Sequence, residues 1–247
     1  MKKSQKKDKE RVVFFLDILG FKNLVNSFDT KKKYIKTILA KLNDLKKYQY
    51  KGSSLKVTTF SDSAIVSFVY TECSGLYSKL EALFFLQKEL LEMGILIRGA
   101  CSMEKAIHTR NYVFGPAINK AYILENKCAL YPRIIISEDI IEKCSSYSMH
   151  ENYNDKKDIL KLLKQDTDGF YYIDYIGYDT VDSHMDHNED WGLYIKRVHD
   201  FIVNGLETND ASIKQKYLWL KDKYNTALKD DLVTKYQNEY SISLLKF

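Results

Sequence analysis

The sequence of 247 residues has only 2 proline and 10 glycine residues, and it contains no hydrophobic run of membrane-spanning length. A membrane helix needs about 18 uninterrupted apolar residues, and collagen-like chains need abundant glycine and proline. Hydrophobic residues nevertheless make up 45% of the chain, which is more than disordered chains contain. We therefore expect a folded globular protein with no membrane partner, built as one large domain or as one domain with an appendage.

Cysteine and arginine are also scarce. The 4 cysteines form no CxxC motif, and the lysine-rich N-terminus has no apolar stretch typical of a signal peptide. Both features predict a cytoplasmic protein with reduced thiols. Only 5 arginines stand against 33 lysines, so an arginine within a strand, such as Arg98, is expected to have a specific role.

Positive charge is concentrated at the N-terminus. The net charge is +5, and residues 1–11 carry six basic and two acidic side chains, so the rest of the chain has a net charge of only +1. A nearly neutral body lacks the clustered lysine and arginine of a nucleic-acid groove, and we expect no nucleic-acid partner. Residues 1–11 are predicted to form a basic disordered tail, with contact to an anionic partner as the alternative.

Hydrophobic periodicity predicts a regular order of strands and helices in the first part of the chain. The predicted elements are strands over residues 12–18, 55–60, 64–69 and 95–100 and helices over 30–48 and 75–93. This βαββαβ order is that of the ferredoxin-like motif, so the fold class is α+β with a palm-like core. The first strand of that motif pairs antiparallel with the third. Asp17, near the end of the first strand, and Asp62, just before the third, are therefore expected to meet at one edge of the sheet.

The rest of the chain is predicted to complete the sheet and to add helices. The expected elements are a helix within residues 113–125, strands over 133–137 and 170–176, a polar excursion over 151–168, and amphipathic helices over 190–206 and 211–228. Residues 12–185 are predicted to form one α+β domain with helices on one face of its sheet. Residues 186–247 are predicted to form a helical extension that packs on this domain or on a partner subunit.

The expected pair of aspartates suggests a definite chemistry. Two carboxylates that converge at a sheet edge can bind two divalent cations such as Mg²⁺, which prefers oxygen ligands and often keeps a nucleotide phosphate in its shell. Two such metals can activate an oxygen nucleophile and neutralise a leaving pyrophosphate. The alternative is that Asp17 caps the following turn and that Asp62 is an ordinary hairpin residue. Position alone does not decide between these interpretations.

Four segments of the sequence resemble, in order, the motifs of the class III nucleotidyl cyclases. The segments are FLDILGF at residues 15–21, TTFSDSA at 58–64, IRGACS at 97–102 and NYVFGPAINKAYILE at 111–125. The resemblance implies that Asp17, Asp62 and the carbonyl of Ile18 hold two Mg²⁺ or Mn²⁺ ions. It also implies that Asn119 orients the ribose or the transition state. A ribose 3′-oxygen would attack the α-phosphate and expel pyrophosphate, in sites formed between the subunits of a homodimer.

Several positions depart from the purine cyclases. Thr58 stands where those enzymes carry a base-selecting lysine or glutamate, and Tyr112 stands where they carry an aspartate or cysteine. A tyrosine at the pocket wall would shrink the pocket toward a pyrimidine ring, and Thr58 can donate or accept a hydrogen bond at the edge of the base. Ile123 and Met103 replace an arginine and a glycine of the family, so a transition-state cation is missing from its usual place.

The sequence is most similar overall to the bacterial pyrimidine cyclases of the Pycsar anti-phage system. The shared segments include Tyr-Pro-Arg at residues 131–133 and Lys-Tyr-x-Trp-Leu at 216–220. This resemblance implies that UTP or CTP is cyclised to a 3′,5′-cyclic nucleotide, which activates a separate effector in anti-phage defence. The implied substrate contacts are Thr58, Phe60, Tyr112 and Phe21, and the implied catalytic residues are Asn119 and Arg98.

Other interpretations of the same residues stay open. Arg98 binds phosphate or a base edge, or it forms a structural ion pair with a carboxylate. Phe60 and Tyr112 line a base pocket or pack as ordinary aromatic residues, and Asn119 acts on the substrate or bonds to a loop. The missing cation favours a catalytically inert nucleotide-binding module, whereas the intact aspartate pair opposes it. A palm-type nucleotidyltransferase that acts on nucleic acid could share this core, but the nearly neutral body argues against it.

Overall fold

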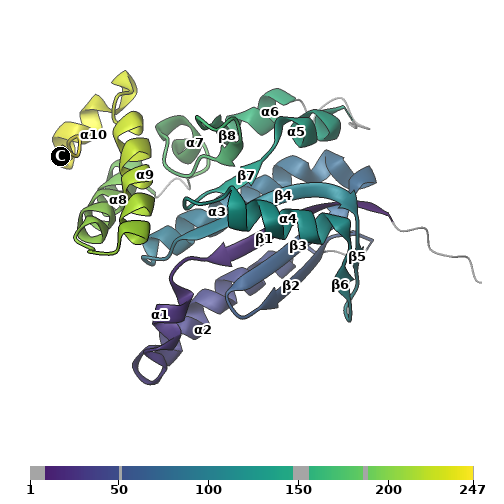
Figure 1. Ribbon diagram of the computed structural model, residues 1–247. Helices are drawn as coiled ribbons and strands as arrows, with labels where there is room; N and C mark the ends of the chain where they lie inside the picture. Colours follow the sequence, from purple (N-terminus) through teal and green to yellow (C-terminus); the bar gives the residue numbers. More distant parts are fainter. Residues whose placement is uncertain (1–8, 50–51, 147–155, 186–188, 247) are drawn as a thin grey trace, which may run out of the picture.

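The computed structural model describes residues 9–49, 52–146, 156–185 and 189–246, and Figure 1 shows how they are arranged. The first half of the chain forms β1 (Glu10–Ile18), α1 (Phe21–Val25), α2 (Phe28–Asp44), β2 (Lys56–Phe60), β3 (Ser63–Val69), α3 (Leu76–Glu92) and β4 (Ile97–Lys105). This sequence of elements confirms the predicted βαββαβ order. Short 3₁₀ turns follow α2 and precede α3.

The second half completes the sheet and adds a helical end. Its elements are β5 (Ile107–His108), β6 (Val113–Phe114), α4 (Pro116–Lys127), β7 (Ile134–Ile136), α5 (Glu138–Ser145), α6 (Lys156–Lys161), β8 (Leu163–Gln165), β9 (Tyr171–Ile173), α7 (Tyr178–Asp182), α8 (Trp191–Leu206), α9 (Ala211–Ala227) and α10 (Thr234–Glu239). The predicted helices over 190–206 and 211–228 are confirmed as α8 and α9. The polar excursion predicted over 151–168 contains α6 and β8, while its first five residues lie outside the described part of the chain.

The sheet has seven strands in the order β2-β3-β1-β4-β7-β9-β8, and β5 pairs with β6 in a separate hairpin. Strand β1 lies between β3 and β4 and pairs antiparallel with both. The order β2-β3-β1-β4 is the strand order of the ferredoxin-like motif, which confirms the predicted α+β class.

Strand β1 is buried on both faces because its sequence is an unbroken apolar run. Its side chains alternate between the two faces of the sheet. Val12, Phe14 and Leu16 pack among side chains of α2 and α3, whereas Val13 and Phe15 pack among side chains of α4. Helices therefore cover both faces, so the prediction of helices on one face of the sheet is wrong: α4 lies on the face opposite α3.

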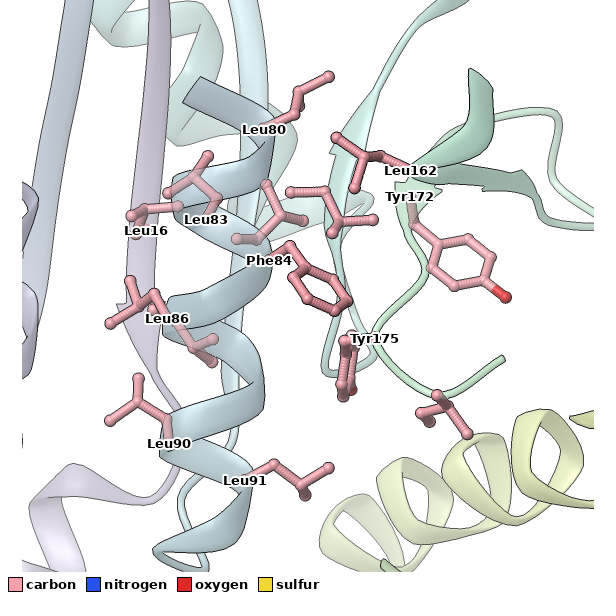
Figure 2. Close-up of a cluster of buried hydrophobic side chains, with 14 of the residues drawn as sticks. Leu16, Leu80, Leu83, Phe84, Leu86, Leu90, Leu91, Leu162, Tyr172 and Tyr175 are labelled. Carbon is pink, nitrogen blue, oxygen red and sulfur yellow. The ribbon is translucent and has the colours of Figure 1, made fainter. Parts of the chain in front are cut away.

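Helix α3 supplies the centre of the larger core. Leu80, Leu83 and Phe84 are at most 1% exposed. Figure 2 shows Leu16 of β1 on one side of this helix and Tyr172 and Tyr175 on the other side. The helix therefore joins the ferredoxin-like half of the sheet to the segments that follow it.

Two predicted boundaries need correction. The strand predicted over 95–100 extends as β4 to Lys105, because its second half continues to pair with β1 from Glu10 to Phe14. The predicted end of the basic tail at residue 11 is wrong, because Glu10 and Arg11 belong to β1 and Arg11 is only 7% exposed. Residues 1–8 of that tail lie outside the described residues.

The C-terminal helices pack on the chain's own core. Asp166 lies in the loop between β8 and β9, and it accepts hydrogen bonds from Trp219 Nε1 at 2.8 Å and from Lys223 Nζ at 2.9 Å. Arg133 forms ion pairs with Asp166 and Asp168 in the same loop. The Trp219 ring also stacks on Tyr131. These contacts attach α9 to the edge of the sheet, beside the strands at its far end (Figure 1). No helix among the described residues has both the length and the apolar character that crossing a membrane requires.

Candidate active site

Asp17 and Asp62 meet at one end of the sheet, as the sequence predicts. Asp17 pairs with Ser63, the first residue of β3, and Asp62 occupies the tight turn just before it. The Ile18 amide donates to the Asp62 carbonyl at 3.0 Å, and the Ser63 hydroxyl donates to Asp17 Oδ1 at 3.4 Å. The other turn residue, Ser61, has a left-handed backbone with φ of 49°, which is unfavourable for a residue other than glycine. A strained turn thus presents Asp62 beside the end of β1.

Arg98 approaches the pair from β4, on the other side of β1. Its register places it opposite Asp17, and its Nε lies 3.4 Å from Asp17 Oδ2. The same Nε lies 2.6 Å from Glu125 Oε1, on helix α4. The ion-pair interpretation of Arg98 is therefore correct for this arrangement, and the guanidinium joins two carboxylates.

Glu125 is a site residue that the sequence analysis did not assign. It is only 2% exposed, although it is a charged helical residue. Ala117 and Ala121, at four-residue steps before it, are fully buried against the sheet. A stripe of small residues that ends in a glutamate is the sequence signal that could have identified a buried carboxylate facing the sheet.

Asp17 and Glu125 resist ionisation. Burial raises the pKa of Asp17, Arg98 opposes that rise, and the negative charge of Asp62 adds to it. Burial raises the pKa of Glu125 to about 7, although Arg98 favours its ionised form. The site therefore holds more acidic groups than its single guanidinium can neutralise, and a cation bound beside Asp17 would favour the ionised forms.

The donor set fits a hard divalent cation that a substrate helps to hold. The Asp17 oxygens have only long contacts of 3.4 Å, so they keep lone pairs available for a metal. Within the described residues, no group of three or more histidine, cysteine or acidic side chains converges as a complete metal site. Mg²⁺ is commonly bound by one or two carboxylates and completes its shell with water and phosphate oxygens. Asp17, Asp62 and the Ile18 carbonyl match that pattern.

A groove at the edge strand β2 includes Thr58, which lies on the same face of the sheet as Asp17. Thr58 and Phe60 point to this face because they pair with Ile65 and Ser63, which share it with Asp17. Thr58 borders a groove of about 380 Å³ together with His108 and Arg110. Phe60 is 64% exposed, so of its two interpretations the one in which it packs in the core is wrong.

The hairpin of β5 and β6 lines one side of this groove. The His108 Nε2 atom lies 2.8 Å from Thr58 Oγ1. Tyr112 lies in the turn of this hairpin, is 65% exposed and does not line the groove. The structure thus brings Thr58 together with His108, a residue that the sequence analysis did not assign, rather than with Tyr112.

Three other sequence predictions have different outcomes. Asn119 and Ile123 lie on the exposed side of α4, one turn apart and away from the side that carries Glu125. Phe21 is 6% exposed and packs in the larger hydrophobic core, so its prediction as a substrate contact is corrected to a packing role. Its burial follows from the turn after β1, which directs α1 toward α2.

The C-terminal extension brings a lysine near this end of the sheet. Lys216 of α9 lines a groove of about 280 Å³ with Leu19 and Gly20, which follow Asp17 closely in the chain. Burial lowers the pKa of Lys216, and the positive charge of Arg98 lowers it further. Lys216 and Arg98 are therefore close enough to interact, and the extension adds a cation beside the aspartates.

Comparison with known proteins gives structural similarity only. No protein-family model matches the sequence, and no curated protein matches it. The solved structures with a similar arrangement include the adenylyl cyclase CyaB from P. aeruginosa, at 16% identity and a TM-score of 0.41, covering 67% of this chain and 94% of that chain. They also include a bacterial light-regulated adenylyl cyclase, at 14% identity and a TM-score of 0.40, covering 71% and 56%.

A further similar structure is the catalytic core of a rhodopsin-guanylyl cyclase with converted specificity in complex with ATPalphaS. It has 16% identity and a TM-score of 0.39, covering 67% of this chain and 94% of that chain. At these identities and TM-scores the likeness identifies neither a substrate nor an activity for this chain.

Proposed function

We propose that the protein is a nucleotidyl cyclase that converts UTP or CTP to a 3′,5′-cyclic nucleotide and pyrophosphate, with Mg²⁺ or Mn²⁺ as its cofactor. The observation that carries this proposal is the meeting of Asp17 and Asp62 at one end of the sheet. Arg98 lies beside the pair, and Thr58, which borders a groove, lies on the same face of the sheet as Asp17. The resemblance of four sequence segments to class III cyclases points to the same chemistry.

The residues of the chain have distinct tasks in this reaction. Asp17, Asp62 and the Ile18 carbonyl hold the divalent cations. When bound, these cations neutralise the triphosphate and lower the pKa of the attacking hydroxyl. The ribose 3′-oxygen bonds to the α-phosphorus while the bond to the bridging oxygen breaks, and the hydroxyl proton passes to solvent. Arg98, held by Glu125, is a fixed cation whose planar fork suits a phosphate.

The groove is placed to receive the base of the nucleotide. Thr58 lies two residues before Phe60, the last residue of β2, which corresponds to about 7 Å along the strand at about 3.3 Å per residue, and the turn that carries Asp62 follows directly. Phe60 lies between the two positions on the same face and offers an exposed ring to the sugar and base.

Asn119 can act in this reaction only through a second copy of the chain. It lies on the exposed side of α4, whereas Asp17 and Glu125 lie between α4 and the sheet. The same surface exposes the apolar side chains of Phe114, Tyr122 and Ile123. Exposed apolar groups of this kind mark interaction surfaces. In a homodimer whose sites form at the subunit interface, the exposed apolar side chains would pack against the second copy, and Asn119 would reach the site of that copy.

The biological setting follows from the resemblance to the Pycsar cyclases. In that setting the enzyme is cytoplasmic, its product is a second messenger, and a separate effector binds the cyclic nucleotide during anti-phage defence. Neither a nucleic acid nor a membrane takes part in the reaction.

Product analysis by mass spectrometry tests the proposed function. Purified protein is incubated with Mn²⁺ and, separately, with ATP, GTP, CTP and UTP. We expect a cyclic pyrimidine nucleotide that disappears in Asp62→Ala and persists in Asp139→Ala, an exposed aspartate of α5 that serves as the matched control. Nucleotide binding without any product would instead support the inert module, which the exposed Ile123 at a cation position favours.

A further inference from the structure

A cavity of about 450 Å³ lies between the β8 edge of the sheet and the C-terminal extension. Its walls come from β8, β9, the first turn of α7 and the end of α9, which lie close together in Figure 1. The lining includes Tyr172, Asp174, Gly177, Tyr178 and Lys223. None of the lining residues belongs to the candidate active site. A cavity of this size can enclose a small organic molecule.

Asp174 brings a buried carboxylate to this cavity. It is 4% exposed, and its Oδ1 atom accepts from the Gly177 amide at 2.9 Å and from the Ile176 amide at 3.3 Å. Its Oδ2 atom has only the Thr180 hydroxyl, at 3.5 Å, and the nearer acceptor for that hydroxyl is the Lys161 carbonyl, at 3.1 Å. A hydroxyl has a single hydrogen to donate. In the described part of the chain, Asp174 Oδ2 is therefore left without a good donor.

This oxygen lies at the wall of the cavity, beside Gly177. A side chain at position 177 would collide with Asp174 Oδ2, so only glycine leaves this oxygen uncovered. The close approach, and not the backbone conformation, requires glycine here, because its φ of −59° suits any residue. Since Gly177 also lines the cavity, a bound molecule can reach Asp174 Oδ2 from that side.

Tyr172 contributes a second polar group to the cavity. It is 5% exposed, and Figure 2 shows its hydroxyl pointing away from the cluster that contains Phe84 and Leu162. Among the described residues, no hydrogen-bond partner is found for this hydroxyl. Burial raises the pKa of Tyr172, and the negative charge of Asp174 raises it further. The hydroxyl therefore stays protonated and lies within electrostatic range of that carboxylate.

The lysines of the cavity do not neutralise Asp174. Lys223 donates to Asp166 Oδ1 at 2.9 Å and lies 3.3 Å from Asp222 Oδ2, so its charge is already paired. The other charged residues of the lining are two lysines and two aspartates that balance one another: Lys164, Lys229, Asp179 and Asp230. Within the described residues, no ion pair includes Asp174.

We propose that this cavity binds a small organic ammonium ion that carries an aromatic ring. An ionised carboxylate oxygen can only accept hydrogen bonds, so its partner must be a donor, and a charged donor also neutralises the buried carboxylate. Asp174 Oδ2 and the Tyr172 hydroxyl oxygen accept from the ammonium group. The rings of Tyr172 and Tyr178 offer apolar surface to the rest of the molecule. The site is separate from nucleotide cyclisation and does not depend on it.

Calorimetric titration of the full-length protein with three probes of similar shape tests the proposal. The probes are 2-phenylethylammonium, the neutral 2-phenylethanol and the anionic phenylacetate. We expect the ammonium ion to bind at least about tenfold more tightly than either of the others, since a hydrogen bond between charged groups is the stronger kind. Equal binding of the three, tighter binding of the anion, or no binding of the ammonium ion at millimolar concentration would overturn the proposal.

Two variants and a control identify the residues responsible. Asp174→Asn removes the charge and should abolish the preference for the ammonium ion over the alcohol. Tyr172→Phe keeps the ring but removes the hydroxyl, and it should weaken binding of the ammonium ion about tenfold. Tyr171→Phe, on the other face of β9, is the matched control and should leave the affinity unchanged.

The variants also guard against a purely structural role for the carboxylate. An unchanged preference in a folded Asp174→Asn protein would overturn the proposal, and so would an unchanged affinity in Tyr172→Phe. If Asp174→Asn does not fold, the Tyr172→Phe result decides. Because the measurement is binding, the outcome is independent of whether the protein cyclises a nucleotide.

Discussion

Replacing Glu125 by glutamine should make the free energy of unfolding less dependent on pH. Burial holds the pKa of Glu125 at about 7, well above its ordinary value of 4.5. Between these two values the folded state keeps a proton that the unfolded state has released, so stability falls as pH rises through this window. Glutamine resembles the protonated form and does not ionise, so this loss should be absent from the variant.

The magnitude follows from the shift. One pKa unit corresponds to about 1.4 kcal/mol, so a carboxyl with this shift costs the wild type about 2 to 3 kcal/mol of stability between about pH 5 and about pH 8. That pKa already includes the opposing effect of Arg98. Urea unfolding of both proteins at the two pH values measures the difference, and all other titrating groups cancel in the comparison.

The control for this experiment is Glu207→Gln, at the exposed C-terminal end of α8. It should follow the wild type at both pH values. If the free energy of unfolding of Glu125→Gln changes with pH as that of the wild type does, Glu125 ionises as an ordinary surface carboxylate. The account of a buried, protonated group beside Arg98 is then wrong.

Three further predictions concern the core, the extension and the phosphates. Phe84→Ala, in a fully buried position, should lower the free energy of unfolding by about 3 to 5 kcal/mol in urea titrations. Trp219→Phe removes the hydrogen bond to Asp166 and should cost about 2 kcal/mol by the same method; no change would mean that this bond does not hold α9 in place. Lys216→Met should raise the KM for the nucleotide about tenfold if the lysine meets a phosphate, whereas Lys214→Met on the exposed side of α9 should leave it unchanged.

The meeting of Asp17 and Asp62 was predictable because it depends on strand register alone. Local sequence patterns predict both the apolar strand β1 and the hairpin of β2 and β3. The βαββαβ order then determines which strands pair. The length of β4 was not predictable in the same way. Its second half, Cys-Ser-Met-Glu-Lys, has no apolar alternation, and its strand conformation comes from pairing with β1.

The residues that were missed depend on long-range packing. Glu125 is buried because two alanines let α4 lie close to the sheet, and His108 reaches Thr58 because a hairpin of two-residue strands closes over β2. Neither arrangement leaves a strong periodic signal in the sequence. Phe21 was assigned to the substrate by resemblance, whereas the direction of α1, a tertiary feature, places it in the core.

The central claim is that Asp17 and Asp62 act together to hold the cations of one reaction. The most direct test is pyrophosphate release from UTP as a function of Mn²⁺ concentration, for the wild type, Asp17→Asn, Asp62→Asn and the double variant. The effects of substituting residues that act as a unit are not additive. Each single variant should therefore lose at least about a thousandfold in rate, and the double variant should be no slower than either single variant. Turnover within about tenfold of the wild type in either single variant would contradict the account.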